Sequence, residues 1–402
     1  MIEKVPEADY QAVQHFITHS PWEYKPVIEQ VAADCNQLLG GSTDSALFID
    51  ESSIPKKGKK SVGVARQWCG RLGKVENCQT GVFAALNKGA YSSIVDTRLY
   101  LPAEWTDDRK RCKAAGVPDD VAFKTKSELA IEMVISARKR GIGFSWIGAD
   151  SGYGKDTPFL YALDDLGETF VADVAKDQSI YLEEPIPFLP DKSSPRGRNP
   201  TRLICDAART RVDQWVASQP EHAWQRVSFR DTTKGKRVAD FLVQRVWLWN
   251  GKDSKSRCFT LLVRREPGKS DCIKYTLTNV GVDTTLERLA FMQGQRYFVE
   301  RSFQDAKSYL GMGQYQVRSW QSWHHHMALV MMAMLFMLEI KLKRHRDISL
   351  LSTADVVALL AHYLPRRDLD EEELFRQMEH RHRQRQDSIN SAYARQKASG
   401  LM

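Results

Sequence analysis

The 402-residue chain is too long for one ordinary hydrophobic core, so we expect it to contain two or three domains. Its composition is 42% hydrophobic and 27% charged, which excludes a largely disordered chain. The formal net charge is +8, and this excess of cations favours a polyanionic partner such as nucleic acid.

The cysteines and the apolar runs indicate the cellular compartment in which the protein is expected. The seven cysteines are scattered and none forms a CxxC pair, so the sequence predicts neither a zinc ribbon nor a disulfide framework. A reducing cytoplasm suits such a chain best. The first residues lack the apolar stretch of a signal peptide. The longest apolar run, 327–338, would rise only about 18 Å as a helix, too little to cross a bilayer, and is expected to be a buried helix.

The N-terminal part of the chain predicts helices followed by strands. Apolar positions recur at helical intervals over residues 1–40. Residues 45–50 then form a short apolar run, which predicts a buried strand that ends on the carboxylate of Asp50. Two more strand candidates, at 79–86 and 92–101, follow with a glycine-bearing turn between them.

The next segment predicts alternating helices and strands. A helix is expected at 127–140, where apolar residues have a helical period and the last turn is basic. The apolar run 144–150 predicts a second buried strand that also ends on a carboxylate, Asp150. A helix at 157–166 and a strand at 168–174 follow. The predicted order is therefore three strands, a helix, a strand, a helix and a strand. This is the order of a ribonuclease-H-like α/β fold, in which helices flank a mixed sheet.

From about residue 181 the sequence pattern changes from alternating helices and strands to a loop and a series of strands. Prolines punctuate a loop, and four strand-like segments follow at 224–231, 238–249, 258–264 and 272–277. Helix returns near 285 and is expected to continue past 340. The predicted domains are a helical region that could bind DNA ends (1–40), the first part of the core (41–180), a β-rich insertion (181–285), the second part of the core (286–345) and a helical appendage (346–402).

Two apolar strands that each end on an aspartate suggest a metal site. Adjacent strands of one sheet would place Asp50 and Asp150 side by side. Magnesium prefers carboxylate oxygens, and two-metal nucleotidyl transfer needs such ligands on rigid elements. The alternative is that each aspartate merely begins a turn.

A third carboxylate occurs in the segment 296–307. Glu300 follows Arg296 by four residues and Lys307 follows it by eleven, so all three share one face of a helix. A carboxylate flanked by cations suits a site that holds metal and DNA phosphate together. An intrahelical salt bridge between Arg296 and Glu300 is the alternative.

The spacing R-x3-E-x6-K resembles the signature Y-x2-R-x3-E-x6-K of DDE insertion-sequence transposases. Residues 48–64 look like the first-aspartate block of such enzymes, and residues 149–154 look like the second. The likeness covers roughly 45–175 and 290–340. One departure is plain, because Gln293 stands where the family's tyrosine is expected.

The resemblance implies roles for these residues. Asp50, Asp150 and Glu300 would be catalytic and would hold two Mg²⁺ ions, for which Mn²⁺ can substitute. Arg296 and Lys307 would contact phosphates of the transposon end, and Arg318, in a further stretch of the likeness, would also bind DNA. The expected partners are double-stranded DNA, as terminal inverted repeats and target, and a second copy of the chain in a synaptic homodimer, with no membrane.

A basic run follows Asp50. Between Pro55 and Lys74 there are seven basic residues and no acidic ones. Because the run begins so close to Asp50, its lysines are predicted to contact the DNA backbone, with a solvated loop as the alternative. The lysines concerned are Lys56, Lys57, Lys59 and Lys60.

Two aromatic and histidine patterns have competing interpretations. Trp247 and Trp249 alternate on a predicted strand and so face one side; they could stack a flipped base, as some relatives do, although core packing is the stronger interpretation. The consecutive residues His324–His326 point about 100° apart on a helix and cannot all bind one ion. We expect one or two of them to face DNA or to pack against the sheet.

The resemblance therefore predicts a DDE transposase that cuts DNA at transposon ends and transfers the strands into target DNA. One alternative is an element-derived DNA-binding protein without cleavage activity. The other is a ribonuclease-H-like nuclease or resolvase. Acidic residues at all three motif positions argue against the first, and the insertion and the Arg–Lys stripe argue against the second.

Overall fold

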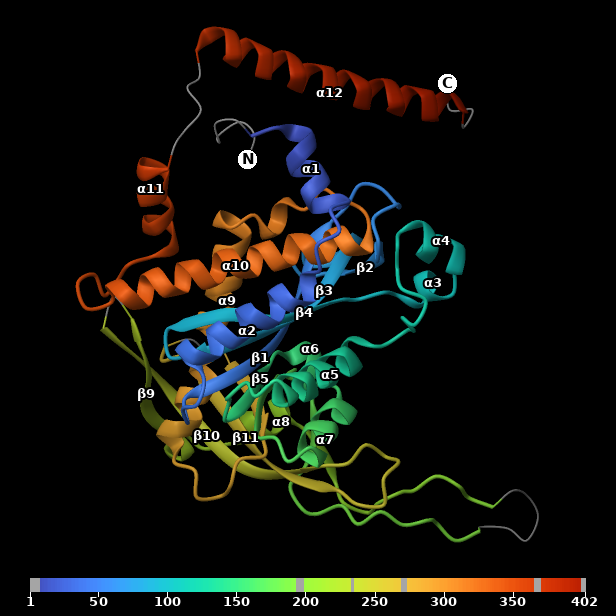
Figure 1. Cartoon of the computed structure of the whole chain (residues 1–402). Coiled ribbons are helices and arrows are strands. Elements are labelled where there is room, and N and C mark those ends of the chain that lie inside the picture. The colour runs from blue at the N-terminus through green and yellow to red at the C-terminus, as the bar shows by residue number, and fades with distance from the viewer. Residues whose placement is uncertain (1–7, 193–198, 233–234, 269–272, 365–369, 399–402) are drawn as a thin grey trace. The chain divides into compact units, whose positions relative to one another are not determined.

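The computed structural model describes residues 8–192, 199–232, 235–268, 273–364 and 370–398. The chain separates into two compact units. Residues 22–350 form the unit that holds the sheet and all the candidate residues (Figure 1). Residues 1–21 and 351–402 form the other, which contains α1 (Tyr10–Thr18), α11 (Thr353–Tyr363) and α12 (Glu371–Ala398).

Five strands of the sheet have the ribonuclease-H-like order β4-β3-β1-β5-β6. They are β1 (Ser45–Pro55), β3 (Lys74–Lys88), β4 (Tyr91–Leu99), β5 (Trp146–Ala149) and β6 (Phe170–Val174). β3 is antiparallel to both β1 and β4, whereas β1, β5 and β6 run parallel. The predicted fold class is confirmed. The short strand β2 (Ala65–Cys69), which pairs with the outer part of β3, was not predicted.

The strands of the predicted insertion extend the same sheet. β6 pairs with β12, and the order continues through β11, β10, β7 and β8, with β9 paired to β10. Their bounds are β7 (Ser179–Tyr181), β8 (Arg209–Arg211), β9 (Gln225–Thr232), β10 (Gly235–Leu248), β11 (Arg257–Arg265) and β12 (Ile273–Thr278). Four of these match the predicted strands, except that Cys272 lies outside the described residues. The insertion is therefore continuous with the core sheet.

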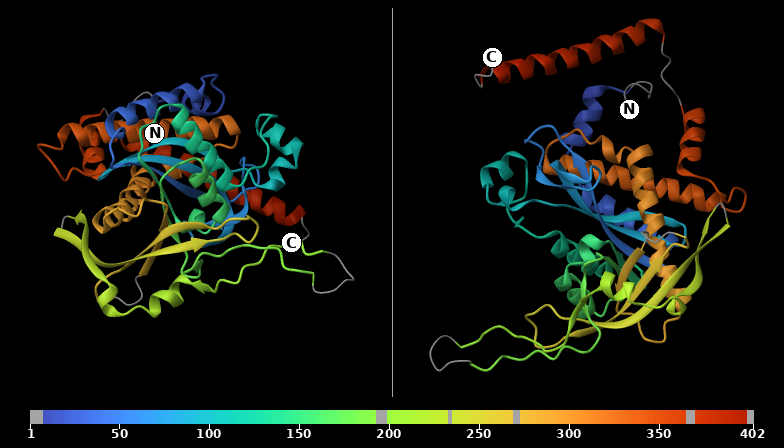
Figure 2. Two further views of the ribbon diagram at one scale, coloured as in Figure 1. Left: turned by 90° about the horizontal axis from the view of Figure 1, so that it is seen from below. Right: turned by 180° about the vertical axis from the view of Figure 1, so that it is seen from behind.

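Helices cover both faces of the sheet (Figure 2). α2 (Tyr24–Leu39) and α10 (Trp320–Arg344) pack against each other and against β4, while α9 (Leu286–Tyr309) packs against β3, β4 and β9. α5 (Lys126–Lys139) packs against β3 and against α7 (Thr157–Asp165). The shorter helices are α3 (Ala103–Thr106), α4 (Arg109–Ala114), α6 (Ser151–Gly154), α8 (Val212–Ala217), η1 (Glu221–Ala223) and η2 (Met312–Gln314).

Two sequence predictions about element ends were wrong. β1 does not stop at Asp50 but continues to Pro55, because its second half pairs with β3 alone after β5 has ended. The helix expected from 285 past 340 is two helices. α9 ends at Tyr309, and Gly311 adopts the left-handed conformation with φ of 78°, which glycine tolerates without steric cost and which breaks the helix before η2.

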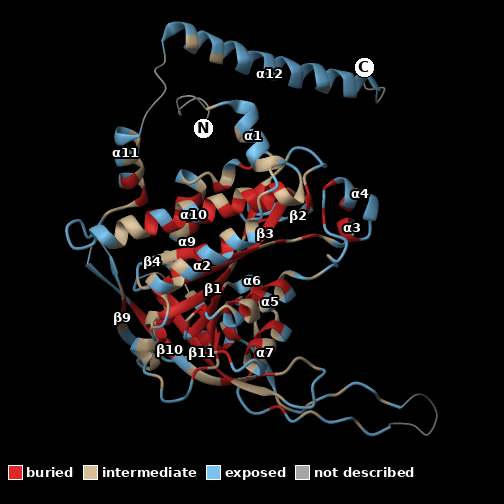
Figure 3. Ribbon diagram, in the orientation of Figure 1, coloured by how far each residue is buried: buried red, intermediate tan, exposed pale blue. Residues whose placement is uncertain are grey.

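The hydrophobic core lies between the central strands and the helices (Figure 3). Trp146, Phe83 and Trp323 are among its largest fully buried side chains. Within the described residues, α10 is the one helix that is long and apolar enough to span a membrane, a test that core helices also pass. Met327 and Met331 on this helix are buried, as expected for a core helix.

Candidate active site

Asp50 and Asp150 lie on neighbouring parallel strands. Ile49 pairs with Ala149 in the register of β1 and β5, so the aspartate that follows each of them is at the same edge. Strands in a sheet are about 4.8 Å apart, which brings the two carboxylates close together. The sequence predicted that adjacent strands would place Asp50 and Asp150 side by side, and the register of β1 and β5 agrees with that prediction.

The backbone around each aspartate fixes its carboxylate. Oδ1 of Asp50 accepts a hydrogen bond from the Glu51 amide at 2.7 Å. Asp150 is the N-cap of α6, and its Oδ1 accepts from the amides of Gly152 at 2.9 Å and Tyr153 at 3.3 Å. These bonds engage Oδ1 in both residues, which leaves the Oδ2 atoms for a cation.

The Asp50 carboxyl group is poorly solvated. Burial is the largest cause that raises its pKa to about 7, and the negative charge of Asp150 raises it further. Arg296 and Lys307 act in the opposite direction but do not cancel these effects. A poorly solvated carboxylate next to a second negative charge carries an electrostatic cost that a bound cation would relieve.

The third predicted acid lies on α9, which Thr285 caps by accepting a hydrogen bond from the Arg288 amide. Glu300 is bonded to the guanidinium of Arg296 at 3.0 Å, so the salt bridge weighed as the alternative is present. The same guanidinium contacts Asp173 on β6 at 2.6 Å. Burial lowers the pKa of Arg296, but the surrounding carboxylates, Asp173 foremost, outweigh burial and raise it.

Asp173 is held by a chain of hydrogen bonds. The Thr276 hydroxyl on β12 donates to Oδ1 of Asp173 at 2.7 Å. That hydroxyl in turn accepts from the buried amide of Gln293 at 2.8 Å. The residue that replaces the family's tyrosine thus supports the carboxylate that positions Arg296.

Two of the three predicted carboxylates are suited to bind a magnesium-type ion. Asp50 and Asp150 offer hard oxygen ligands from rigid elements. The Tyr153 hydroxyl, buried beside them, has no hydrogen-bond partner among the described residues, and a hydrated cation would supply one. Across the described ranges no three acidic, histidine or cysteine side chains are grouped closely enough for a metal, since Glu300 is turned to Arg296.

A family model described as DDE superfamily endonuclease matches residues 1–236, more than half of the chain. The chain belongs to the DDE superfamily of endonucleases. The matched segment contains Asp50 and Asp150, whereas Glu300 lies beyond it.

The chain is also similar to a probable transposase for insertion sequence element IS701 from Microchaete diplosiphon. The two are 30% identical over 174 residues, which is 43% of this chain and 42% of the relative. The similarity thus spans less than half of either protein.

The cations predicted to contact DNA in this DDE endonuclease fall into two groups. Lys57, Lys59 and Lys60 are exposed, and so is Arg318. Lys56 instead donates to the Tyr315 carbonyl oxygen at 2.6 Å, and burial lowers its pKa to about 8. Lys56 is therefore half-buried and tied to the protein's own backbone.

Lys307 is close to the acidic pair. Burial is the largest cause that lowers its pKa, and the charge of Asp50 raises it. Its ammonium group also lies 5.8 Å from the centre of the Phe303 ring. Lys307 thus remains a candidate phosphate contact next to Asp50.

The two tryptophans of the insertion lie away from the acidic edge. Asp173, Thr276, Leu262 and Val243 form one row across the sheet. Trp247 is four residues beyond Val243 on β10, roughly 13 Å along the strand and away from the acids. Trp247 and Trp249 are both partly buried, and the Trp249 indole donates to the Asp253 carbonyl oxygen at 2.7 Å. We leave both out of the catalytic site.

The three histidines pack inside the DDE endonuclease. His324 contacts the Trp320 carbonyl oxygen at 2.9 Å, His325 that of Trp22 at 2.8 Å and His326 that of Gly311 at 3.1 Å. A carbonyl oxygen only accepts, so each ring nitrogen donates. Packing, one of the two expected roles, accounts for all three histidines.

Sequence reasoning missed Asp173, Glu51 and Lys126. Glu51 follows Asp50 and forms an ion pair with Lys126 at 2.6 Å. Asp173 sits near the end of the predicted strand 168–174, at the edge that carries Asp150. A carboxylate on a third parallel strand was the signal that could have identified it.

Proposed function

We propose that this DDE endonuclease is an insertion-sequence transposase, which cuts DNA at the ends of its element and transfers the freed 3′ ends into target DNA. The observation that carries the proposal is the paired register of β1 and β5, which sets Asp50 and Asp150 side by side next to Arg296 and Lys307. Likeness over 174 residues to a protein named a probable transposase supports the same reading.

Asp50 and Asp150 would hold divalent metal through their Oδ2 atoms, and Glu300 is the candidate third ligand. Bound Mg²⁺ would supply activation of the attacking oxygen and stabilisation of the leaving oxygen. Glu300 is paired with Arg296, which also contacts Asp173 on β6, and Glu300 would have to turn from Arg296 to bind the metal. Lys307 would bind a phosphate oxygen of the cut strand, and the exposed lysines after Asp50 would bind the flanking backbone.

The proposed partners follow from this chemistry. The polyanionic substrate is double-stranded DNA, as element ends and as target, in the cytoplasm. Two ends are processed together, so we include a homodimer in the proposal. No membrane is required.

The test is a plasmid excision assay. The plasmid carries the gene with its flanking DNA, and the purified protein is added with Mg²⁺ or with EDTA. We expect the parent protein to cleave at the element ends with Mg²⁺ and not with EDTA. The variants Asp50→Asn and Asp150→Asn should lose this cleavage but still bind the element ends. Binding without cleavage by the parent protein would support a DNA-binding descendant, and cleavage of branched junctions alone would support a resolvase.

A further inference from the structure

The hairpin formed by β2 and β3 exposes apolar side chains at its tip. Over residues 66–75, here called the hairpin tip, Trp68 is 53% exposed, Leu72 45% and Val75 52%. Apolar groups left in water at a protruding edge are costly to maintain, and they commonly mark a contact surface. The tip is therefore a candidate contact surface.

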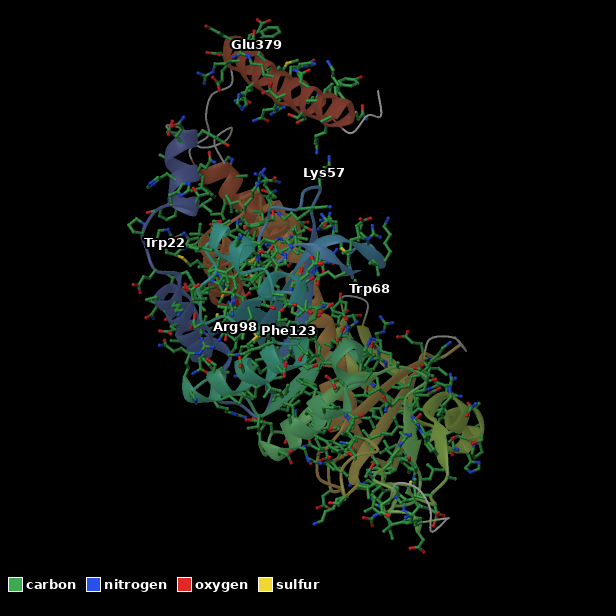
Figure 4. All side chains as sticks on the ribbon, turned by 90° about the vertical axis from the view of Figure 1, so that its right-hand side faces the viewer. Trp22, Lys57, Trp68, Arg98, Phe123 and Glu379 are labelled. Carbon is green, nitrogen blue, oxygen red and sulfur yellow. The ribbon has the colours of Figure 1, made fainter. Side chains whose placement is uncertain are left out.

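The hairpin tip lies beside the acidic pair. Trp68 lines a cavity of about 610 Å³ together with Asp150, Lys126 and Lys155. On the other side, Lys307 lies within electrostatic range of both Asp50 and Arg71. In Figure 4, Trp68 and Lys57 are both labelled on the right-hand side of the view.

The charge around the hairpin tip selects the partner. Arg66 and Arg71 are exposed, whereas the exposed Lys74 is paired with Glu76 at 3.3 Å. Lys155 adds an exposed cation at the cavity wall, where the other cation, Lys126, is paired with Glu51 at 2.6 Å. A partner that combines negative charge with flat apolar faces is a nucleic acid strand, whose bases stack on aromatic rings and whose phosphates pair with cations.

Stacking on Trp68 requires a base with an open face. Within a duplex each base is covered by its neighbours, so only an unpaired or terminal base offers one. The cavity is much larger than one base and is bordered by a candidate metal ligand. A strand entering it would bring the nucleotide beside the cleaved phosphate against the indole.

We propose that Trp68 stacks on an unpaired or terminal DNA base next to the phosphate that is cut, with Arg66, Arg71 and Lys155 contacting the flanking phosphates. The proposal rests on the proposed function, because it assigns the DNA position of that same site. A second copy of the chain is the competing occupant of the apolar tip.

The experiment measures DNA binding in EDTA, so that it does not depend on cleavage. One probe is a 30-base-pair duplex with a five-nucleotide 3′ overhang, which carries 2-aminopurine at the first unpaired position; the other is the blunt duplex. Full-length parent, Trp68→Ala and Trp68→Phe are compared. Phe336→Ala is the control, since it removes an aromatic side chain of similar exposure (46%) from α10.

We expect Trp68→Ala to lose roughly 5- to 100-fold in affinity for the overhang probe and less than twofold for the blunt duplex. Quenching of 2-aminopurine should occur with the parent, Trp68→Phe and Phe336→Ala but not with Trp68→Ala. Equal losses on both probes, or unchanged quenching in Trp68→Ala, would overturn the proposal. Loss of self-association instead of DNA binding, seen by light scattering, would assign the tip to a protein interface. Mg²⁺-dependent excision by the parent protein tests the proposed function separately, so excision by the parent would leave that function intact whichever of these binding results is found.

Discussion

Asp50 lies in an environment that disfavours its charged form when no cation is bound. Its pKa is raised from 3.8 to about 7, mainly by burial and then by Asp150, so folding disfavours its charged form. The folded state therefore binds more protons than the unfolded state between about pH 4 and 7, and stability falls as pH rises through this window. The cost is absent below pH 4 and complete above pH 7.

Replacing Asp50 by asparagine should remove this cost. The rise in pKa corresponds to at most about 4 kcal/mol, so metal-free Asp50→Asn should be more stable than the parent at pH 8 by up to that amount. The difference should vanish near pH 4. Urea unfolding in EDTA at both pH values measures it, and a variant that is less stable at pH 8 would contradict the environment described for Asp50.

Asp173 acts through Arg296. Asp173→Asn removes the ion pair at 2.6 Å and leaves the guanidinium with Glu300 alone, free to compete with metal for the neighbouring acids. We expect a loss of about 2–4 kcal/mol in stability and a several-fold higher Mg²⁺ concentration for half-maximal cleavage.

Asp240→Asn is the matched control for Asp173. Asp240 is also largely buried and pairs with Arg226 at 2.8 Å, but on β10 outside the acidic edge. It should lose stability without any change in the Mg²⁺ requirement. An identical Mg²⁺ dependence in the two variants would reduce Asp173 to a structural role.

At the scale of elements, the short helix α6 fixes Asp150. A side chain at Gly154 would overlap the carbonyl oxygen of Asp173, so only glycine lets α6 lie against β6. Gly154→Ala should therefore displace Asp150 and abolish metal-dependent cleavage, with a stability loss of several kcal/mol.

Gly281→Ala serves as the comparison, because a methyl group there meets no neighbouring atom and the backbone is not left-handed. It should change neither cleavage nor unfolding by more than about 0.5 kcal/mol. Wild-type cleavage by Gly154→Ala would show that the close approach of α6 and β6 does not position Asp150.

The elements also show what the sequence could and could not predict. Strong apolar runs such as 144–150 predicted their strands and the order of the core, because burial on both faces leaves a clear pattern. The end of β1 was misplaced because pairing with β3 alone continues past Asp50. β2 escaped notice since its exposed residues give no apolar alternation. Partners across the sheet, such as Asp173 and Thr276, depend on register that no local pattern reveals.

At the scale of the whole molecule, the chain has a net charge of +8, and a run of basic residues follows Asp50, where it could bind the DNA backbone. Replacing Lys57, Lys59 and Lys60 together by alanine should lower the slope of log affinity against log salt by up to about 2.7, since each phosphate contact contributes about 0.9. Lys56→Ala should leave the slope unchanged and lower stability instead, because Lys56 is bonded to Tyr315. Fluorescence anisotropy across a salt series measures both, and equal slopes in parent and triple variant would remove the loop from the DNA contacts.

The central claim is that Asp50 and Asp150 share a metal ion, and Fe²⁺-directed cleavage of the polypeptide tests it most directly. Fe²⁺ takes the place of Mg²⁺, and added hydrogen peroxide oxidises it to Fe³⁺ with release of hydroxide and a hydroxyl radical that cuts the nearby backbone, while ascorbate regenerates Fe²⁺. We predict cuts close to residues 50 and 150, suppressed by excess Mg²⁺ and absent in Asp50→Asn. Cuts confined to other parts of the chain, or cuts at these positions that persist in Asp50→Asn, would contradict the account.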